Sequence, residues 1–108
     1  MKLILAAVLV ASLLIGPAEA QGFTYSGQGT LSCGTWMVDR REGMASGPQQ
    51  WVSGFLSGVG FALASKNYDP LHGVDADGVW AWIDNYCRAN PIDIVINAAE
   101  AFVRAHPR

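Results

Sequence analysis

Apolar residues recur at steps of three and four over most of the chain downstream of residue 33, and this is the spacing of one buried helix face. The clearest run predicts a helix from Pro48 to about Ala64, with Ser46 or Gly47 as its cap. Trp51 lies at the edge of its apolar face, which consists of Val52, Phe55, Leu56, Val59 and Leu63. The pattern therefore predicts an amphipathic helix at the centre of the sequence.

Two shorter patterns flank this central helix. A stretch over 35–42, which carries Trp36, predicts a first helix just after Cys33. Asp75 is a favourable N-cap for a third helix over 76–88. The apolar side of that third helix consists of Val79, Trp80, Ile83, Tyr86 and Cys87.

A fourth helix is predicted near the carboxyl end. Asn90 is suited to cap it, Pro91 to open it, and Asp93 to interact with the helix dipole in its first turn. We expect this helix to run to about Ala105. Its buried stripe would consist of Ile92, Val95, Ile96, Ala99, Phe102 and Val103. No stretch alternates strictly between apolar and polar residues, so the sequence predicts an all-α fold, a small four-helix domain.

The central helix also carries many small residues: Ser53, Gly54, Ser57, Gly58 and Gly60. Each helical glycine costs about 1 kcal/mol relative to alanine. Glycines persist in helices where another backbone comes close, and the spacing of Gly54 and Gly58 is that of paired membrane helices. Two interpretations stay open: close packing against a helix of the same domain, and a face for self-association.

Residues 1–20 have the organisation of a cleavable export signal. Lys2 supplies a positive start, residues 3–15 are almost entirely apolar, and small side chains at 18 and 20 predict cleavage before Gln21. The apolar run is shorter than the ~20 residues that a membrane-spanning helix needs, so an uncleaved anchor is the less favoured alternative. The sequence predicts a secreted protein without a stable membrane anchor, which would be periplasmic in a Gram-negative bacterium.

The rest of the chain divides into a lead-in and one small domain. Residues 21–32 are rich in Gly, Ser, Thr and Gln and predict a flexible lead-in, whereas residues 33–108 contain the predicted helices. In an oxidising compartment, Cys33 and Cys87 predict a disulfide, worth about 4 kcal/mol in the chain-entropy model. Two free thiols, or half of a metal site, are the alternatives, although the sequence contains no CxxC motif.

Charge and candidate chemistry argue against several function classes. Seven basic and nine acidic residues give a net charge of −2 without a basic stripe, so we expect neither nucleic acid nor a membrane surface as partner. Asp75 and Asp77 begin like a calcium loop, but the later ligands are missing. His72 has no nucleophile motif with it, so we expect a solvated loop residue. The sequence predicts no metal, no cofactor, no catalytic residue and no enzymatic activity.

Four tryptophans are many for a chain of this size: Trp36, Trp51, Trp80 and Trp82. Trp80 and Trp82 are two positions apart on a predicted helix, so they cannot both enter the same core face. We expect one of them to lie on the surface or at an interface, with partial burial under the lead-in as the alternative. Trp82 is therefore a candidate interface residue.

Three features together resemble the HdeA/HdeB family of small periplasmic acid-stress chaperones: the junction Tyr86–Pro91 (YCRANP), a cysteine at the head of the first helix, and a Pro-led second helix. The Gly-containing helix and a last helix ending in His106-Pro107 are also similar to Tai-type immunity proteins, which block peptidoglycan amidases delivered by type VI secretion. The first resemblance implies an all-helical fold with one disulfide, Cys33–Cys87. It also implies a dimer at neutral pH that loosens in acid and holds unfolding clients.

A chaperone of this kind would bind unfolded clients, or a second copy of itself, through an apolar helix face. The candidate face consists of Trp51, Val52, Phe55 and Val59, with Trp82 as a further interface residue. Acid would neutralise the carboxylates and leave a self-repelling positive chain. The chain departs from the chaperones in being poor in lysine, because Lys66 is the only lysine downstream of the signal.

The alternative function is that of an immunity or inhibitor protein, which would block one partner enzyme such as a peptidoglycan amidase. An inhibitor needs a fixed and shaped surface rather than a broad face that is exposed conditionally. The loop Lys66–Val74, which contains Tyr68 and His72, is the candidate for such a surface.

Overall fold

The computed structural model describes residues 22–107, so the predicted export signal lies outside the described residues. Its four α-helices are α2 (Cys33–Glu42), α3 (Ser46–Ala62), α4 (Ala76–Ala89) and α5 (Val95–Ala105). Two single-turn 3₁₀ helices are η1 (Gln28–Thr30), before α2, and η2 (Ala64–Lys66), after α3. Within these residues the only extended pairing is an isolated antiparallel bridge between Ser32 and Ile94. The predicted all-α, four-helix class is confirmed.

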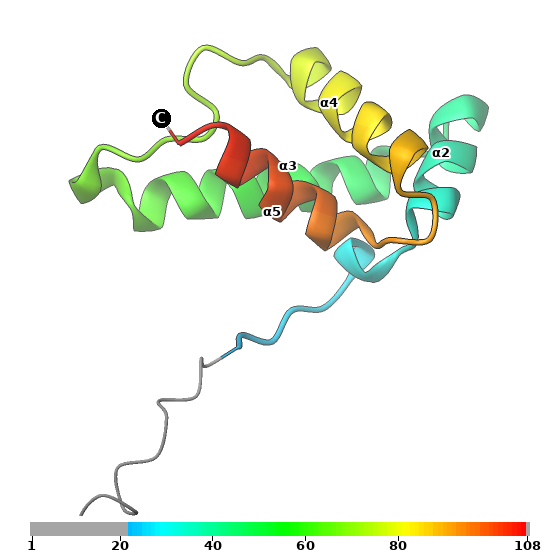
Figure 1. The fold of residues 1–108 in the computed structure, drawn as a ribbon, viewed down its shortest axis with the longest axis horizontal. Helices are drawn as coiled ribbons and strands as arrows, with labels where there is room; N and C mark the ends of the chain where they lie inside the picture. Colours follow the sequence, from blue (N-terminus) through cyan, green and yellow to red (C-terminus); the bar gives the residue numbers. More distant parts are fainter. Residues whose placement is uncertain (1–21, 108) are drawn as a thin grey trace, which may run out of the picture.

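Helix α5 occupies the middle of the fold, because it packs against both α3 and α4 (Figure 1). Helix α2 stands at one end of the domain and packs against α4. The short helix η1 contacts α3 and α5. The order of packing is therefore α2, α4, α5 and α3, which differs from the order along the chain.

The core is apolar and follows the helical period that the sequence predicts. Val52 and Leu56 lie four residues apart on α3, and both are completely buried. The other large side chains with less than 2% exposure include Trp36, Ile83, Ile96 and Phe102. No polar or charged residue is buried in the described part of the chain. The polar interactions that fix the helices must therefore lie at the edge of this core.

The start of α2 is held by the chain that precedes α5. Ser32 caps the helix with its hydroxyl oxygen. The backbone N–H groups of Cys33 and Gly34 have no partner within the helix. They donate to the carbonyl oxygens of Asp93 (2.7 Å) and Pro91 (3.0 Å), respectively. These bonds satisfy helix-terminal donors with groups some sixty positions away, so α2 and the start of α5 are fixed to each other.

Because the carbonyl groups of Pro91 and Asp93 accept hydrogen bonds from α2, helix α5 begins at Val95 and not at the predicted Pro91. Asn90 does not cap α5; it ends α4, where its side-chain amide donates to a carbonyl oxygen of the last turn at 2.9 Å. Residues 91–94 form a loop, because two of their carbonyl groups are directed toward α2 and do not continue a helix. Ile92, which was predicted to be buried, is 95% exposed for this reason.

The turn between α2 and α3 also differs from the prediction. Helix α3 already begins at Ser46, and its N-cap residue, Ala45, makes no side-chain capping bond. Neither Ser46 nor Gly47 therefore acts as the cap, although Pro48 does lie in the first turn. Gly43 ends α2 with φ at +71°, a left-handed conformation that glycine adopts without strain.

The second half of the predicted flexible lead-in is part of the folded domain. Trp51 donates its indole Nε1–H to the carbonyl oxygen of Ser26 at 2.7 Å. Gly29 is buried against the same indole, and a Cβ atom at this position would lie 2.4 Å from the ring. Glycine therefore serves close packing at a position where composition indicated flexibility.

The small residues of α3 do not mediate close packing between helices of this chain. Apart from the chain neighbours and the backbone of α3 itself, no atom of the described chain lies within 4 Å of the place that a Cβ would take at Gly54 or Gly58. Both residues are exposed, so the interpretation of close packing inside the domain is wrong for them. Among the helices of residues 22–107, none has the length and apolar character needed to cross a bilayer.

Candidate functional site

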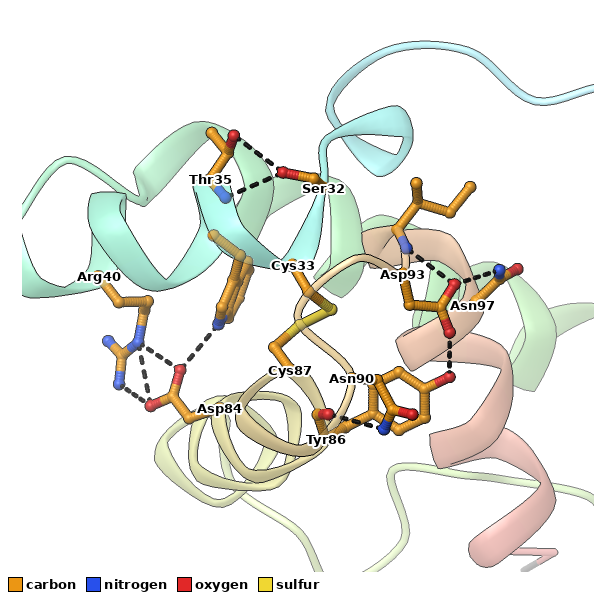
Figure 2. The surroundings of a disulfide bond; sticks show 12 residues. Ser32, Cys33, Thr35, Arg40, Asp84, Tyr86, Cys87, Asn90, Asp93 and Asn97 are labelled. Atoms are coloured by element: carbon orange, nitrogen blue, oxygen red, sulfur yellow. Dashed lines mark hydrogen bonds and ion pairs between the residues drawn. A yellow bond between two sulfur atoms is a disulfide. The ribbon is translucent and has the colours of Figure 1, made fainter.

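A disulfide joins Cys33 in the first turn of α2 to Cys87 in the last turn of α4 (Figure 2). Both cysteines are completely buried, and their Cα atoms lie 4.8 Å apart. The predicted pairing is confirmed, and the described residues contain no free cysteine. The disulfide fixes α2 on α4 between two clusters of polar side chains.

The first cluster lies where α2 packs on α4, around the carboxylate of Asp84 (Figure 2). The indole Nε1–H of Trp36 donates to Oδ1 at 2.8 Å, and Arg40 forms an ion pair with Oδ2 at 2.9 Å. The hydrogen bond from Arg40 to Asp84 is the main cause that raises the pKa of the guanidinium above its ordinary value. Because Trp36 is completely buried, Asp84 accepts from an indole N–H that water does not reach.

The second cluster, which we call the Asp93 cluster, consists of Asp93, Tyr86, Asn97 and the backbone N–H of Ile94 (Figure 2). Asp93 accepts hydrogen bonds from the Tyr86 hydroxyl at 2.5 Å, from the Asn97 amide at 2.6 Å and from Ile94 at 2.9 Å. The bond from Tyr86, followed by those from Asn97 and Ile94, lowers the pKa of Asp93 below its ordinary value. The same bond raises the pKa of Tyr86. One ionised carboxylate thus links the start of α5 to α4.

The five predicted interface residues do not form one exposed patch. Val52 is completely buried, so it cannot contact a partner while the domain is folded. Trp51, Phe55 and Val59 are partly buried at four-residue steps along α3, and the rings of Trp51 and Phe55 stack at 5.4 Å. Trp82 lies on α4, away from this row.

Trp80 and Trp82 pack against different neighbours, as their spacing on a helix requires. The ring of Trp80 lies 6.1 Å from that of Trp36. Trp82 packs among three rings of α4 and the end of α5, those of Tyr86, Phe102 and His106. Both indoles are partly buried; the prediction left open a place on the surface or at an interface for one of them, and partial burial under the lead-in. Their partners are helices, and it is Trp51 that lies under the lead-in.

Phe55 and Val59 line an apolar groove between α3 and α5, which we call the α3/α5 groove. Its other lining residues are Phe23, Glu100, Val103 and Arg104. The groove has a volume of about 210 Å³, and a protein cavity of about 150 Å³ is already large enough for benzene. At its rim, Arg104 approaches Glu100 to 3.9 Å across one turn of α5. The groove therefore combines an apolar slot with one carboxylate and one guanidinium.

A second depression lies in the loop between α3 and α4, where the inhibitor surface was predicted. This loop hollow has a volume of about 350 Å³ and is lined by Gly60, Ala64, Asn67, Tyr68, Asp69 and His72. The loop is fixed to the domain, because the Tyr68 hydroxyl donates to the carbonyl oxygen of Val103 at 2.8 Å and Pro70 is buried. Tyr68 and His72, predicted together, do face one hollow, and His72 is exposed.

Sequence reasoning found the α3 side of the groove but missed Phe23, Val103 and the charged rim. The apolar period of the last helix was a usable signal for Val103, since it places this residue on the buried stripe. Phe23 carries no such signal, because it lies in a segment without periodicity.

Neither metal ligands nor similarity to known proteins identifies a function for this chain. Among residues 22–107, no three side chains of His, Cys, Asp or Glu lie close enough to hold a metal ion. The chain matches no model of a known protein family, and neither a curated protein nor a solved structure is significantly similar to it.

Proposed function

We propose that this protein is an exported, non-enzymatic binding protein that holds unfolding proteins through the apolar face of α3, in the manner of the HdeA-like acid-stress chaperones. One observation carries the proposal. The helix that covers this face, α5, is linked to α4 by the hydrogen bond that Tyr86 donates to the ionised carboxylate of Asp93, which also accepts from Asn97 and Ile94 at the start of α5. A link of this kind is weakened by acid.

Acid acts on both polar clusters in the same direction. A protonated Asp93 loses the charge that strengthens its hydrogen bonds with Tyr86 and Asn97. A protonated Asp84 loses its ion pair with Arg40. The two helices that pack on α4 are then held less firmly, and the apolar side chains that α3 and α5 bury against each other become accessible.

The overall charge supports the same behaviour. Nine acidic residues outnumber seven basic ones at neutral pH, or eight and six after removal of Lys2 and Glu19 with the predicted signal, and in strong acid only the positive charges remain. Repulsion between these charges favours an open chain. The chain would therefore expose apolar surface under the conditions in which other exported proteins unfold.

The test is suppression of aggregation. The processed protein is added to an enzyme that aggregates below pH 3, and light scattering is followed together with sedimentation and tryptophan emission between pH 7 and pH 2. We expect protection in acid and none at pH 7, and Asp93→Asn, which mimics the protonated state, should shift protection to higher pH. Glu42→Gln, which removes an exposed carboxylate at the end of α2, is the control. If sedimentation and emission stay constant to pH 2 and scattering is not reduced, the proposal is wrong.

A second candidate function is inhibition of one partner enzyme, such as a peptidoglycan amidase. It is favoured by the fixed loop between α3 and α4, since Tyr68 and Pro70 hold this loop in one conformation and a preformed surface binds at lower entropic cost. The test is stoichiometric inhibition of a purified amidase at neutral pH. Loss of inhibition in His72→Ala, with inhibition retained in Ile92→Ala, would establish this function over the chaperone.

A further inference from the structure

We propose that the α3/α5 groove, together with the extended segment 22–26, binds an extended peptide segment that carries an aromatic side chain. The inference rests on the proposed function, because it names the class of protein segment that the binding protein takes up. Unlike the proposed chaperone activity, which requires acid, this peptide binding takes place in the folded domain at neutral pH.

The slot itself fits one aromatic ring. Its volume of about 210 Å³ exceeds the roughly 150 Å³ that accommodates benzene in a protein interior. Phe55 offers a ring that already stacks on Trp51, and Val59 and Val103 supply branched aliphatic walls. Aromatic rings pack favourably in stacked or edge-on arrangements in such surroundings.

Phe23 forms the remaining wall without filling the slot. Its side chain is 60% exposed, and its ring lies 5.6 Å from that of Tyr25. A side chain so weakly held can close over an incoming ring and gain burial by doing so. Phe23 therefore has more contact to make when the groove is occupied than when it is empty.

The backbone next to the groove favours a peptide over an isolated apolar ligand. Residues 22–26 run as an extended stretch outside the helices (Figure 1). The backbone groups of 22–25 make no hydrogen bond within the described part of the chain. The downstream end of this stretch is fixed, because the carbonyl oxygen of Ser26 accepts from Trp51. An anchored extended segment with free N–H and C=O groups can form backbone hydrogen bonds with a second extended chain.

The rim supplies hydrogen-bonding groups for the same occupant. The Glu100 carboxylate accepts hydrogen bonds and the Arg104 guanidinium donates them, so the pair suits the N–H and C=O groups of a peptide backbone. Arg104 can also stack on an aromatic face. The extended segment and the rim thus favour a peptide backbone, and the slot favours an aromatic side chain on it.

The experiment uses the processed protein at pH 7 and two synthetic probes, acetyl-Ser-Thr-Phe-Thr-Ser-amide and the same peptide with alanine in place of phenylalanine. The methyl signals of Val59 and Val103 are followed by NMR during titration. We expect saturable shifts with the phenylalanine peptide in the millimolar range and none with the alanine peptide. Equal shifts with both peptides, or none with either, would overturn the proposal.

Variants locate the site. Val59→Asp should weaken binding at least tenfold and Phe23→Ala about threefold, whereas Ile92→Ala, which changes an exposed side chain outside the groove, should leave it unchanged. Phe23 lies outside the helices, so Phe23→Ala tests the site even if Val59→Asp disturbs folding. Unchanged binding in Phe23→Ala would contradict the proposal. If the protein binds the peptide but does not protect clients in acid, the chaperone proposal is wrong and the groove proposal stands. If it protects clients in acid but does not bind the peptide, only the groove proposal is wrong.

Discussion

The indole nitrogen of Trp36 and the carboxylate of Asp84 are 48 positions apart in the sequence and 2.8 Å apart in the structure. Trp36 is completely buried, yet its one polar atom reaches the edge of the core, where Asp84 also binds Arg40. The pair therefore fixes both the depth and the rotation of α2 on α4.

Asp84→Ala should lower the free energy of unfolding by about 2 to 3 kcal/mol, because it leaves a buried indole N–H and a partly buried guanidinium without a partner. Asp84→Asn, which keeps an acceptor for Trp36, should cost less. Urea unfolding followed by tryptophan emission measures both effects. Glu100→Gln removes a long ion pair, 3.9 Å from an exposed Arg104, and should stay within about 0.5 kcal/mol of the wild type. If Asp84→Ala costs no more than this control, the account of α2 docking is wrong.

The contribution of Asp93 to stability should depend on pH. Its pKa is lower in the folded protein than the ordinary 3.8, so its stabilisation is complete above about pH 5 and is lost as the pH falls through the lowered value. Asp93→Asn should therefore be less stable than the wild type at pH 7, and the difference should shrink toward pH 2. Urea midpoints at pH 7, 5, 3 and 2 give this comparison. A difference that stays constant over the whole range would contradict the role of the charge.

Alanine substitutions of glycines should have opposite effects at different sites. Gly54→Ala and Gly58→Ala meet open space on an α-helix and should each stabilise the domain by about 0.5 to 1 kcal/mol. Gly29→Ala should destabilise it, because the new methyl group would meet the Trp51 ring. Thermal unfolding measures all three. Destabilisation by the α3 substitutions would mean that another molecule already lies against this face.

Reduction of the disulfide should lower stability by about 4 kcal/mol, since the bond constrains a long segment of the unfolded chain. The two cysteines are separated by 54 positions. Urea unfolding with and without a thiol reductant gives the difference, and Cys33→Ala with Cys87→Ala provides the covalent control. Equal midpoints in oxidised and reduced protein would show that the disulfide does not hold α2 in place.

The elements that the sequence predicts well are those whose signals are local. The period of α3 correctly identifies Val52 and Leu56 as core residues, and Asp75 caps α4 by accepting from the N–H of Gly78 at 2.8 Å. The cysteine pair could be predicted because the chain offers only one way to join two cysteines. In each case the deciding interaction lies within a few residues or has no competitor.

The elements that could not be predicted depend on distant partners. Asn90 and Pro91 carry good local signals for a helix start, but the carbonyl of Pro91 is used by α2 instead. Gly29 belongs to a segment of flexible composition, and its packing depends on Trp51. The groove draws Phe23 from the lead-in and Val103 from α5, so no single period reveals it.

The disulfide also has a topological consequence. It closes a covalent ring that contains α2, α3 and α4, whereas α5 lies outside this ring as a tail. Helices inside the ring are tethered at both ends, so even when unfolded they explore a restricted volume. Helix α5 is not part of the ring, so its separation from α3 would leave the ring unchanged. A protease that cuts the linker 90–94 would release α5 as a free fragment, whereas a single cut inside the ring would release nothing until the disulfide is reduced.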